Sequence, residues 1–204
     1  MQEVSRGIGL DNRIGSKFLH AGPGFGGSCF PKDTRALLKI ALDHDVPLRI
    51  VDSVLAVNEN RKRAMARKVA ATLGGQLRGK TIAVLGLTFK PDTDDMREAP
   101  SIPLITGLID MGAQVRAFDP AGMEQAKHEL PTIKYCDDAY SCARGADALV
   151  IITEWVQFRT LDLPRLKQAM KQPVIVDLRN IYRRDDVEAL GFTYECIGRP
   201  RSAD

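Results

Sequence analysis

The stretch Thr81-Ile82-Ala83-Val84-Leu85-Gly86-Leu87-Thr88-Phe89-Lys90 decides the fold of the second half of this 204-residue chain. It opens with a short, mostly apolar run that ends at a glycine, which is typical of a buried β-strand. Similar runs alternate with helical patterns after it, as in a parallel sheet wrapped by helices. The predicted strands cover residues 81–85, 114–118, 133–136, 148–152, 174–176 and 192–195. The predicted helices cover residues 100–111, 121–129, 137–143, 162–171 and 184–190. Because such crossovers are right-handed, we expect an α/β fold with a Rossmann-like, doubly wound parallel sheet.

Two cations are predicted at the ligand-binding edge of this sheet. Open parallel sheets bind their ligands at the carboxyl ends of the strands. Lys90 follows the first predicted strand and Arg179 follows the fifth, so both should reach that edge and suit a phosphate. From the residues alone, an ordinary surface or loop cation is the better interpretation of each. Gly86 stands without the other glycines of the G-x-G-x-x-G pattern, so we expect no NAD site in this domain.

The first 76 residues are predicted to be helical, with helices over about 32–44 and 48–73. The first ten residues look like the tail of a helix, so we expect a segment ahead of them. The helix over 48–73 would span roughly 40 Å, and polar residues around 58–62 interrupt its apolar stripe. So long a helix favours a partner surface, on the following domain or on a second subunit; core packing alone is the alternative. A glycine-rich linker at 74–79 predicts two domains, residues 1–76 and 77–204.

A glycine-rich loop leads through one cysteine into the first of these helices. It reads Ala21-Gly22-Pro23-Gly24-Phe25-Gly26-Gly27-Ser28-Cys29-Phe30-Pro31-Lys32-Asp33. Glycine lets a backbone approach a ligand closely, and proline suits the first helical position. A cysteine just ahead of a helix meets the positive end of the helix dipole, which favours the thiolate, and Lys32 adds a cation. Asp33 lies four residues past the sulfur, within reach if the turn is helical. We interpret the stretch as a nucleophilic thiol in a pocket for an anionic or oxygen-rich ligand.

Residues 24–33 of this stretch resemble the active-site signature of the nucleotide-sugar 6-dehydrogenases, the UDP-glucose/GDP-mannose dehydrogenase family. Three other segments fit the same family: Asp11-Asn12-Arg13-Ile14-Gly15-Ser16-Lys17-Phe18-Leu19, Phe89-Lys90-Pro91-Asp92-Thr93-Asp94-Asp95-Met96-Arg97 and Val176-Asp177-Leu178-Arg179-Asn180. The similarity extends over nearly the whole chain, in the right order and spacing.

The resemblance implies roles for thirteen residues. Cys29 would be the nucleophile, and Asp33 the carboxylate that orients or deprotonates water. Arg13 would reach a nucleotide sugar in a neighbouring subunit. The loop around the sugar and the pyrophosphate would include His20, Gly22, Gly24, Phe25 and Gly26. The uridine-diphosphate side of the pocket would include Phe89, Lys90 and Arg179. Lys32 and Arg97 would touch the NAD.

The implied reaction oxidises the C6 alcohol of UDP-glucose to the acid of UDP-glucuronate by two hydride transfers to NAD. Cys29 would add to the intermediate aldehyde, and water would hydrolyse the resulting thioester. The resemblance also implies a homodimer formed through the long helix. The family places an NAD-binding Rossmann domain ahead of this region, and we expect the chain to be inactive without it.

Two other classes of function stay open. One is a nucleotide-sugar-binding module that performs no chemistry and does not depend on Cys29. The other is a dehydrogenase for a different nucleotide sugar, GDP-mannose or a UDP-N-acetylhexosamine. The run Phe30-Pro31-Lys32-Asp33 after the cysteine favours UDP-glucose.

Composition excludes several other classes. Hydrophobic residues make up 44% of the chain and charged residues 27%, as in an ordinary globular protein. No apolar run approaches the roughly 20 residues of a membrane span, so we expect no membrane association. The cysteines (29, 136, 142 and 196) lack metal-ligand spacing, and the basic run at 61–68 lacks interleaved aromatic residues. We therefore expect no metal site and no nucleic-acid partner. The absence of a secretory signal predicts a cytoplasmic protein with free thiols.

Overall fold

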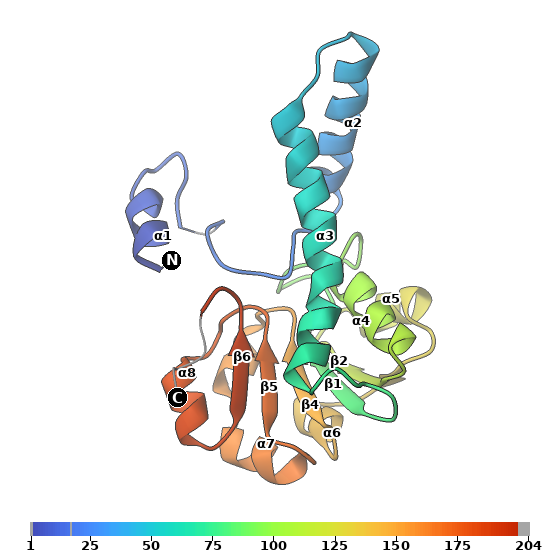
Figure 1. The fold of residues 1–204 in the computed structure, drawn as a ribbon, viewed down its shortest axis with the longest axis vertical. Coiled ribbons are helices and arrows are strands. Elements are labelled where there is room, and N and C mark those ends of the chain that lie inside the picture. Colours follow the sequence, from blue (N-terminus) through green and yellow to red (C-terminus); the bar gives the residue numbers. More distant parts are fainter. Residues whose placement is uncertain (1, 17, 200–204) are drawn as a thin grey trace.

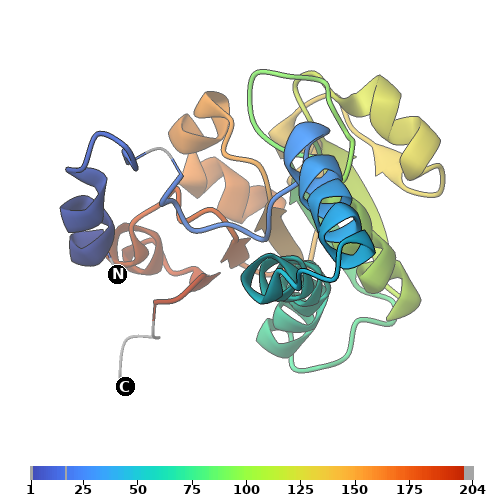
Figure 2. The ribbon, with the colours of Figure 1, turned by 90° about the horizontal axis from the view of Figure 1, so that it is seen from above.

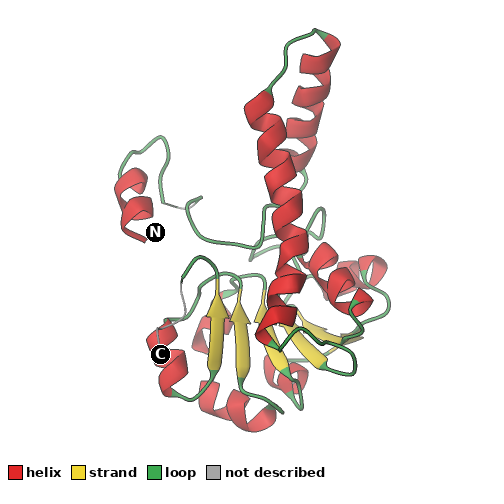
Figure 3. Ribbon diagram, viewed as in Figure 1, coloured by secondary structure: helices red, strands yellow, loops and turns green. Residues whose placement is uncertain are grey.

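The computed structural model describes residues 2–16 and 18–199 and contains a six-stranded parallel sheet (Figure 3). The strand order is β3-β2-β1-β4-β5-β6, that of a doubly wound, Rossmann-like sheet, so the predicted fold class is confirmed. The strands are β1 (Thr81–Leu85), β2 (Gln114–Phe118), β3 (Lys134–Tyr135), β4 (Ala148–Ile151), β5 (Val174–Asp177) and β6 (Thr193–Cys196). The helices are α1 (Gln2–Gly9), α2 (Cys29–Asp43), α3 (Arg49–Thr72), α4 (Ser101–Asp110), α5 (Met123–Glu129), α6 (Ala139–Ala143), η1 (Val156–Thr160), α7 (Leu163–Ala169) and α8 (Arg184–Ala189).

Side chains alternate between two apolar layers along the central strands, because successive residues of a strand point to opposite faces. In β1, Ile82 and Val84 belong to the layer that α3, α4 and α5 cover. Ala83 and Leu85 belong to the opposite layer, which α6, α7 and α8 cover. All four side chains are fully buried. Each face of the sheet therefore has its own core, as a run of consecutive apolar residues requires.

Helix α3 has two halves with different surroundings. Its C-terminal half packs into the core of the sheet through Met65, Ala66, Val69 and Ala70. Gly107 of α4 lies against Ala66, where an added methyl group would come within 2.9 Å of the alanine Cβ. The predicted boundary at residues 76 and 77 stays a prediction, but this packing joins the second half of α3 to the sheet.

The N-terminal half of α3 pairs with α2 in a hairpin that projects away from the sheet (Figures 1 and 2). Both views place α1 apart from this hairpin, on the β6 side of the sheet. The hairpin exposes several apolar side chains, among them Ile40, Ile50 and Val57. Within the described residues, none of the helices is both long and apolar enough to cross a membrane.

The observed elements differ from the predicted ones at a few ends. Helix α2 begins at Cys29, three residues earlier than predicted, because Pro31 occupies the third helical position, where its missing N–H is not needed. The short helix η1 was not predicted. The predicted tail of a helix over residues 1–10 corresponds to α1, with Met1 outside the described residues.

Candidate active site

The order of the sheet reverses between β1 and β4, and the loops that leave these two strands form the centre of the candidate site. Ligands of doubly wound sheets bind at this kind of switch point. Gly86, which ends β1, has a φ of +88° and packs so closely on Thr153 that a side chain would overlap it. Thr153 Oγ1 donates a hydrogen bond to Thr88 O at 2.6 Å, so the two loops are fixed to each other.

Asp119, at the end of β2, is fully buried and holds the same loop from the other side. Its Oδ2 accepts hydrogen bonds from the Leu87 and Thr88 backbone N–H groups, at 2.6 and 3.2 Å, and from Trp155 Nε1 at 3.2 Å. Its Oδ1 accepts from the backbone N–H groups of Ala121 and Gly122. One carboxylate therefore ties together the segments that follow β1, β2 and β4.

The turn after β5 is fixed in a similar way and carries Arg179. Buried Asp177 accepts a hydrogen bond from the Arg179 backbone N–H at 2.9 Å and another from the Tyr194 hydroxyl at 2.7 Å. Burial, followed by the Asp177 carboxylate, raises the pKa of Tyr194, so its hydroxyl stays a donor. The Arg179 guanidinium then pairs with Glu154, which follows β4. Arg179 thus lies at the predicted edge in a defined position.

The glycine loop packs directly on this edge. A methyl group at Gly22 would overlap Nη1 of Arg179, and one at Gly27 would come within 2.9 Å of the Phe89 ring. The Gly27 N–H donates to Arg97 O at 2.8 Å. Three predicted components, the glycine loop, the segment around Phe89 and Arg179, therefore meet in space although they are far apart in the sequence.

Cys29 is the first residue of α2 and is exposed. Its Sγ lies 3.6 Å from Ser28 Oγ. The pKa of Lys32 is raised chiefly by its hydrogen bond to Asp33, and that of Arg97 chiefly by its bond to Asp95; the charge of Cys29 contributes to both. Lys32 and Arg97 are therefore two cations near the sulfur, and they suit an anionic ligand beside it.

Four predicted site residues are exposed, and none of them is among the nearest neighbours of the loop glycines. Asp33 pairs with Lys32 at 3.0 Å and is two-thirds exposed. Arg13 pairs with Asp11 at 2.6 Å, and its side chain is 89% exposed. His20 is exposed at the entry to the glycine loop. Lys90 is exposed beside Phe89, with its Nζ 5.4 Å from the centre of that ring.

Several residues of the site were missed by the sequence analysis. They are Asn58 and Arg61, which bind the glycine loop, Glu98, which binds α2 and α3, and Asp119 and Glu154, which follow strands. The last two stand at carboxyl ends of strands, so the rule that identified Lys90 could have found them. Asn58 and Arg61 belong to the polar interruption of the apolar stripe at 58–62, which marked them without showing their partner, and Glu98 carries no local signal.

The remaining candidate features point elsewhere. Cys136, Cys142 and Cys196 are free and buried in the sheet domain, so they serve as small apolar residues. The described residues contain no group of three or more side chains that could hold a metal ion. Two cavities, of about 340 and 510 Å³, lie along α3, one against α2 and one against α4, rather than at Cys29.

Comparisons with known proteins match both halves of the chain to one family. Residues 83–184, half of the chain, match the UDP binding domain of the UDP-glucose/GDP-mannose dehydrogenase family, and residues 1–60 match its central domain. The chain is 62% identical over 200 residues to a UDP-glucose 6-dehydrogenase from Rhizobium meliloti, covering 98% of this chain and 46% of that protein. It spans about half the length of the curated relatives it matches.

Two solved structures are similar over most of the chain. A UDP-glucose dehydrogenase from Pyrobaculum islandicum has a TM-score of 0.81 at 34% identity, covering 96% of this chain and 42% of that one. An NDP-N-acetyl-D-galactosaminuronic acid dehydrogenase from Methanosarcina mazei has a TM-score of 0.83 at 29% identity, covering 97% and 44%. The chain, by its family match and by its fold, belongs to the UDP-glucose/GDP-mannose dehydrogenase family.

Proposed function

We propose that this chain provides the nucleophile and the UDP-sugar-binding surface of an NAD-dependent UDP-glucose 6-dehydrogenase, which forms UDP-glucuronate. One observation carries the proposal. The glycine loop that leads into Cys29 packs on Phe89 and Arg179 at the switch point of the sheet. A thiol, a phosphate-binding edge and a loop of close-packed backbone are thereby brought together, as oxidation of a nucleotide sugar through a thioester requires.

The substrate would lie along the carboxyl edge of the sheet. Lys90 and Arg179 supply the positive charge for a diphosphate, and Phe89 supplies an apolar ring beside it. Arg179 is already paired with Glu154, so it is held in place before a phosphate arrives. The backbone of residues 22–26 would face the sugar, since its glycines allow close approach. Arg13 and His20 are both exposed and would contact the sugar or the diphosphate. For Arg13, this would be the ligand of a second subunit, reached by exchanging its present pairing with Asp11.

Cys29 would act on the aldehyde formed by the first oxidation at C6. Its sulfur forms a bond to C6, and the carbonyl electron pair moves to oxygen and takes a proton, which gives a thiohemiacetal. A second oxidation at C6 converts this adduct to a thioester. Water, oriented by Asp33, then adds to C6; the C–S bond breaks, and the sulfur leaves as thiolate. The exposed position of Cys29 at the start of α2 fits this role.

NAD would supply the hydride acceptor for the two oxidations. Lys32 and Arg97 fit contacts to it, because both are exposed cations within electrostatic range of Cys29. The sheet itself fits NAD poorly. Gly86 is alone at the β1 turn, and Asp119, where dinucleotide-binding domains place the acid that binds the ribose, is saturated by buried hydrogen bonds. Gly22, Gly24 and Gly27 match the glycine fingerprint in spacing, but among the described residues ahead of them there is no strand.

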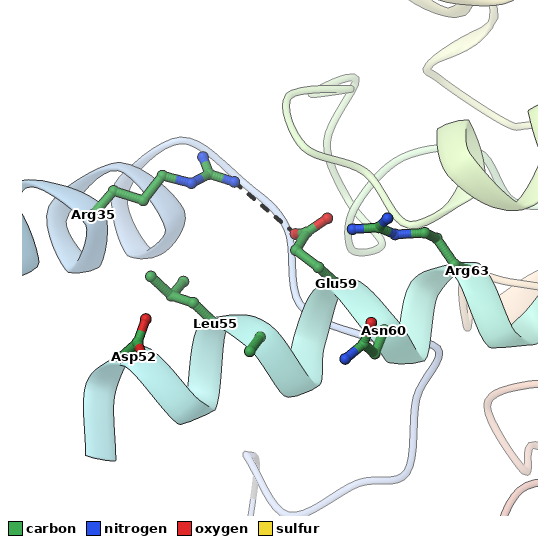
Figure 4. Close-up of a pocket in the computed structure, with 7 residues that line it drawn as sticks. Arg35, Asp52, Leu55, Glu59, Asn60 and Arg63 are labelled. Atoms are coloured by element: carbon green, nitrogen blue, oxygen red, sulfur yellow. Dashed lines mark ion pairs between the residues drawn. The ribbon is translucent and has the colours of Figure 1, made fainter. Parts of the chain in front are cut away.

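A homodimer formed through the α2–α3 hairpin is part of the proposal. Ile50 is 81% exposed, Val57 65% and Ile40 57%, and exposed apolar side chains gathered on one hairpin favour an interface. The groove between the two helices carries charges of both signs (Figure 4), with Arg35 of α2 aimed at Glu59 of α3. Sedimentation velocity should show a dimer that Ile50→Glu dissociates. Val156→Glu, at an equally exposed apolar site on η1, should leave it intact.

Calorimetric titration tests the substrate. We expect UDP-glucose to bind and GDP-mannose not to, and Lys90→Ala to weaken UDP-glucose binding. The similarity to the Methanosarcina mazei enzyme favours a UDP-N-acetylhexosamine as the second candidate, so a UDP-N-acetylhexosamine belongs in the same series. Selective binding of GDP-mannose would refute the proposal. Location in the cytoplasm fits the four free thiols.

A further inference from the structure

The polar residues that interrupt the apolar stripe of α3 lie beneath the glycine loop. Asn58 is only 5% exposed, and its side chain makes two hydrogen bonds to one residue of that loop. Its Oδ1 accepts from the Phe25 backbone N–H at 2.8 Å, and its Nδ2 donates to Phe25 O at 3.1 Å. A single amide side chain thus satisfies both backbone groups of Phe25, as a neighbouring β-strand would.

The loop has few other anchors. Arg61 Nε, one turn further along α3, donates to Gly22 O at 2.7 Å, and the Gly27 N–H donates to Arg97 O. Asn58 therefore supplies the contact in the middle of the loop, between an anchor at each end. Cys29 follows Phe25 by four residues, so the direction of the chain at Phe25 affects where the sulfur lies.

The sequence of the loop is matched to this contact. Gly24 has a φ of +137°, a region that only glycine adopts without strain. A methyl group there would lie 2.9 Å from Asn58 Oδ1 and 2.9 Å from Cγ of Lys62, which is itself buried. The buried amide of Asn58 makes its hydrogen bonds to the loop.

We propose that Asn58 is a positioning residue, which fixes the glycine loop at Phe25 and so orients both the backbone that faces the sugar and the nucleophile Cys29. The orientation toward a sugar rests on the proposed function; the restraint on the loop does not. Each hydrogen bond of this kind changes a local equilibrium about fivefold. Loss of both should release the loop about 30-fold.

Hydrogen exchange of backbone amides tests the restraint on the chain as it stands. We expect the Phe25 amide to exchange about 30-fold faster in Asn58→Ala than in the unchanged protein. Asn58→Asp keeps the acceptor for the Phe25 N–H but places a carboxylate oxygen against Phe25 O, so it should restore part of the protection and leave exchange between about fivefold and about 30-fold faster. Asn60→Ala removes an exposed asparagine two residues away on the same helix and should change nothing. Amides of β1 and β4 should be unaffected in all three variants.

Two results would overturn the proposal. One is equal exchange at Phe25 in Asn58→Ala and Asn60→Ala. The other is a loss of protection in β1 and β4 together with the loop, which would show that Asn58 has a general structural role. If Asn58→Ala does not fold, the proposal is likewise overturned unless Asn58→Asp shows faster exchange in the loop alone. Titration with UDP-glucose is a separate readout, in which Asn58→Ala should weaken binding and Asn58→Asp should recover part of it. If the unchanged chain binds no UDP-glucose, the proposed function loses support, while the exchange data still decide the role of Asn58.

Discussion

Replacing Asp119 with asparagine should destabilise the fold. The size of the effect can be calculated from the hydrogen bonds that this carboxylate accepts. Asparagine has the same shape, but one of its two terminal atoms is a donor. If the amide nitrogen takes the place of Oδ1, it faces the N–H groups of Ala121 and Gly122, at 2.9 and 2.7 Å. If it takes the place of Oδ2, it faces those of Leu87, Thr88 and Trp155.

At least two hydrogen bonds to a charged acceptor are therefore lost in either orientation. Each is worth about 1.5–3 kcal/mol, so Asp119→Asn should lower the free energy of unfolding by at least about 3 kcal/mol. For a domain with a total stability of about 5–15 kcal/mol this is a large fraction. With a urea slope of about 2 kcal/mol per molar, the unfolding midpoint should fall by about 1.5 M.

The assay is urea unfolding followed by tryptophan fluorescence and far-ultraviolet circular dichroism. Trp155 is the single tryptophan, and its indole N–H bonds Asp119 directly, so its emission reports on the altered site. Asp137→Asn, at an exposed position after β3, is the matched control and should leave the midpoint unchanged. A midpoint for Asp119→Asn within 0.3 M of that control, a bound set by about a fifth of the expected shift, would refute the reasoning.

Three further predictions concern the edge of the site. Gly22→Ala should displace the Arg179 guanidinium and weaken UDP-glucose binding about tenfold. The melting temperature should change little, because the displaced group is the end of a flexible side chain. Gly7→Ala, where the added methyl group meets open space, is the control for the calorimetric titration, and equal affinities of the two variants for UDP-glucose would contradict the prediction. The hydrogen bond from Arg35 lowers the pKa of Glu98, so this carboxylate stabilises the fold above pH 4.5 and the contribution disappears as the pH falls through the folded-state pKa. Both side chains are more than a third exposed, so the free energy of unfolding of Glu98→Gln should be lower than that of the unchanged chain by less than about 1 kcal/mol at neutral pH. Melting curves recorded between pH 3 and 7 should show this difference disappearing in acid. A difference that grows in acid would exclude this pairing. Iodoacetamide should rapidly modify only Cys29 of the four thiols in the native chain, and this fast labelling should be lost in Cys29→Ser. A hydrogen bond with Cys142 lowers the pKa of Cys136 to about 7, but burial shields that sulfur from the reagent. Labelling of Cys136 as fast as that of Cys29 would show the reasoning to be wrong.

The sheet could be predicted because its signals are local. Each strand is a short apolar run between turn residues and carries its own signal, so the six strands and the α-helices between them, though not η1, were found without knowing what they pack against. The positions of Lys90 and Arg179 followed from topology, since residues after parallel strands share one edge of a sheet. The long α3 was equally visible, from its 3.6-residue periodicity.

What could not be predicted depends on contacts between distant segments. Asn58 lies 33 residues from Phe25 in the sequence, and Glu98 lies 63 residues from Arg35; no periodicity announces such pairs. The start of α2 at Cys29 was missed because Pro31 was assigned to the first helical position, although it is also tolerated two residues later. Asp33 was placed near the sulfur from helical spacing, and its ion pair is with Lys32. The assigned roles of these residues stay predictions.

The saturated carboxylate at the end of β2 limits what this sheet can be converted into. An enzyme designer who wished to give it a dinucleotide specificity could add glycines after β1, yet a ribose hydroxyl would still find no acceptor. Asp119 could turn outward only by releasing the backbone of Leu87 and Thr88, and the segment that presents Phe89 and Lys90 would then lose its shape. Conversion of this sheet to dinucleotide binding therefore cannot proceed by single surface changes. It would require rebuilding the interior of the edge first.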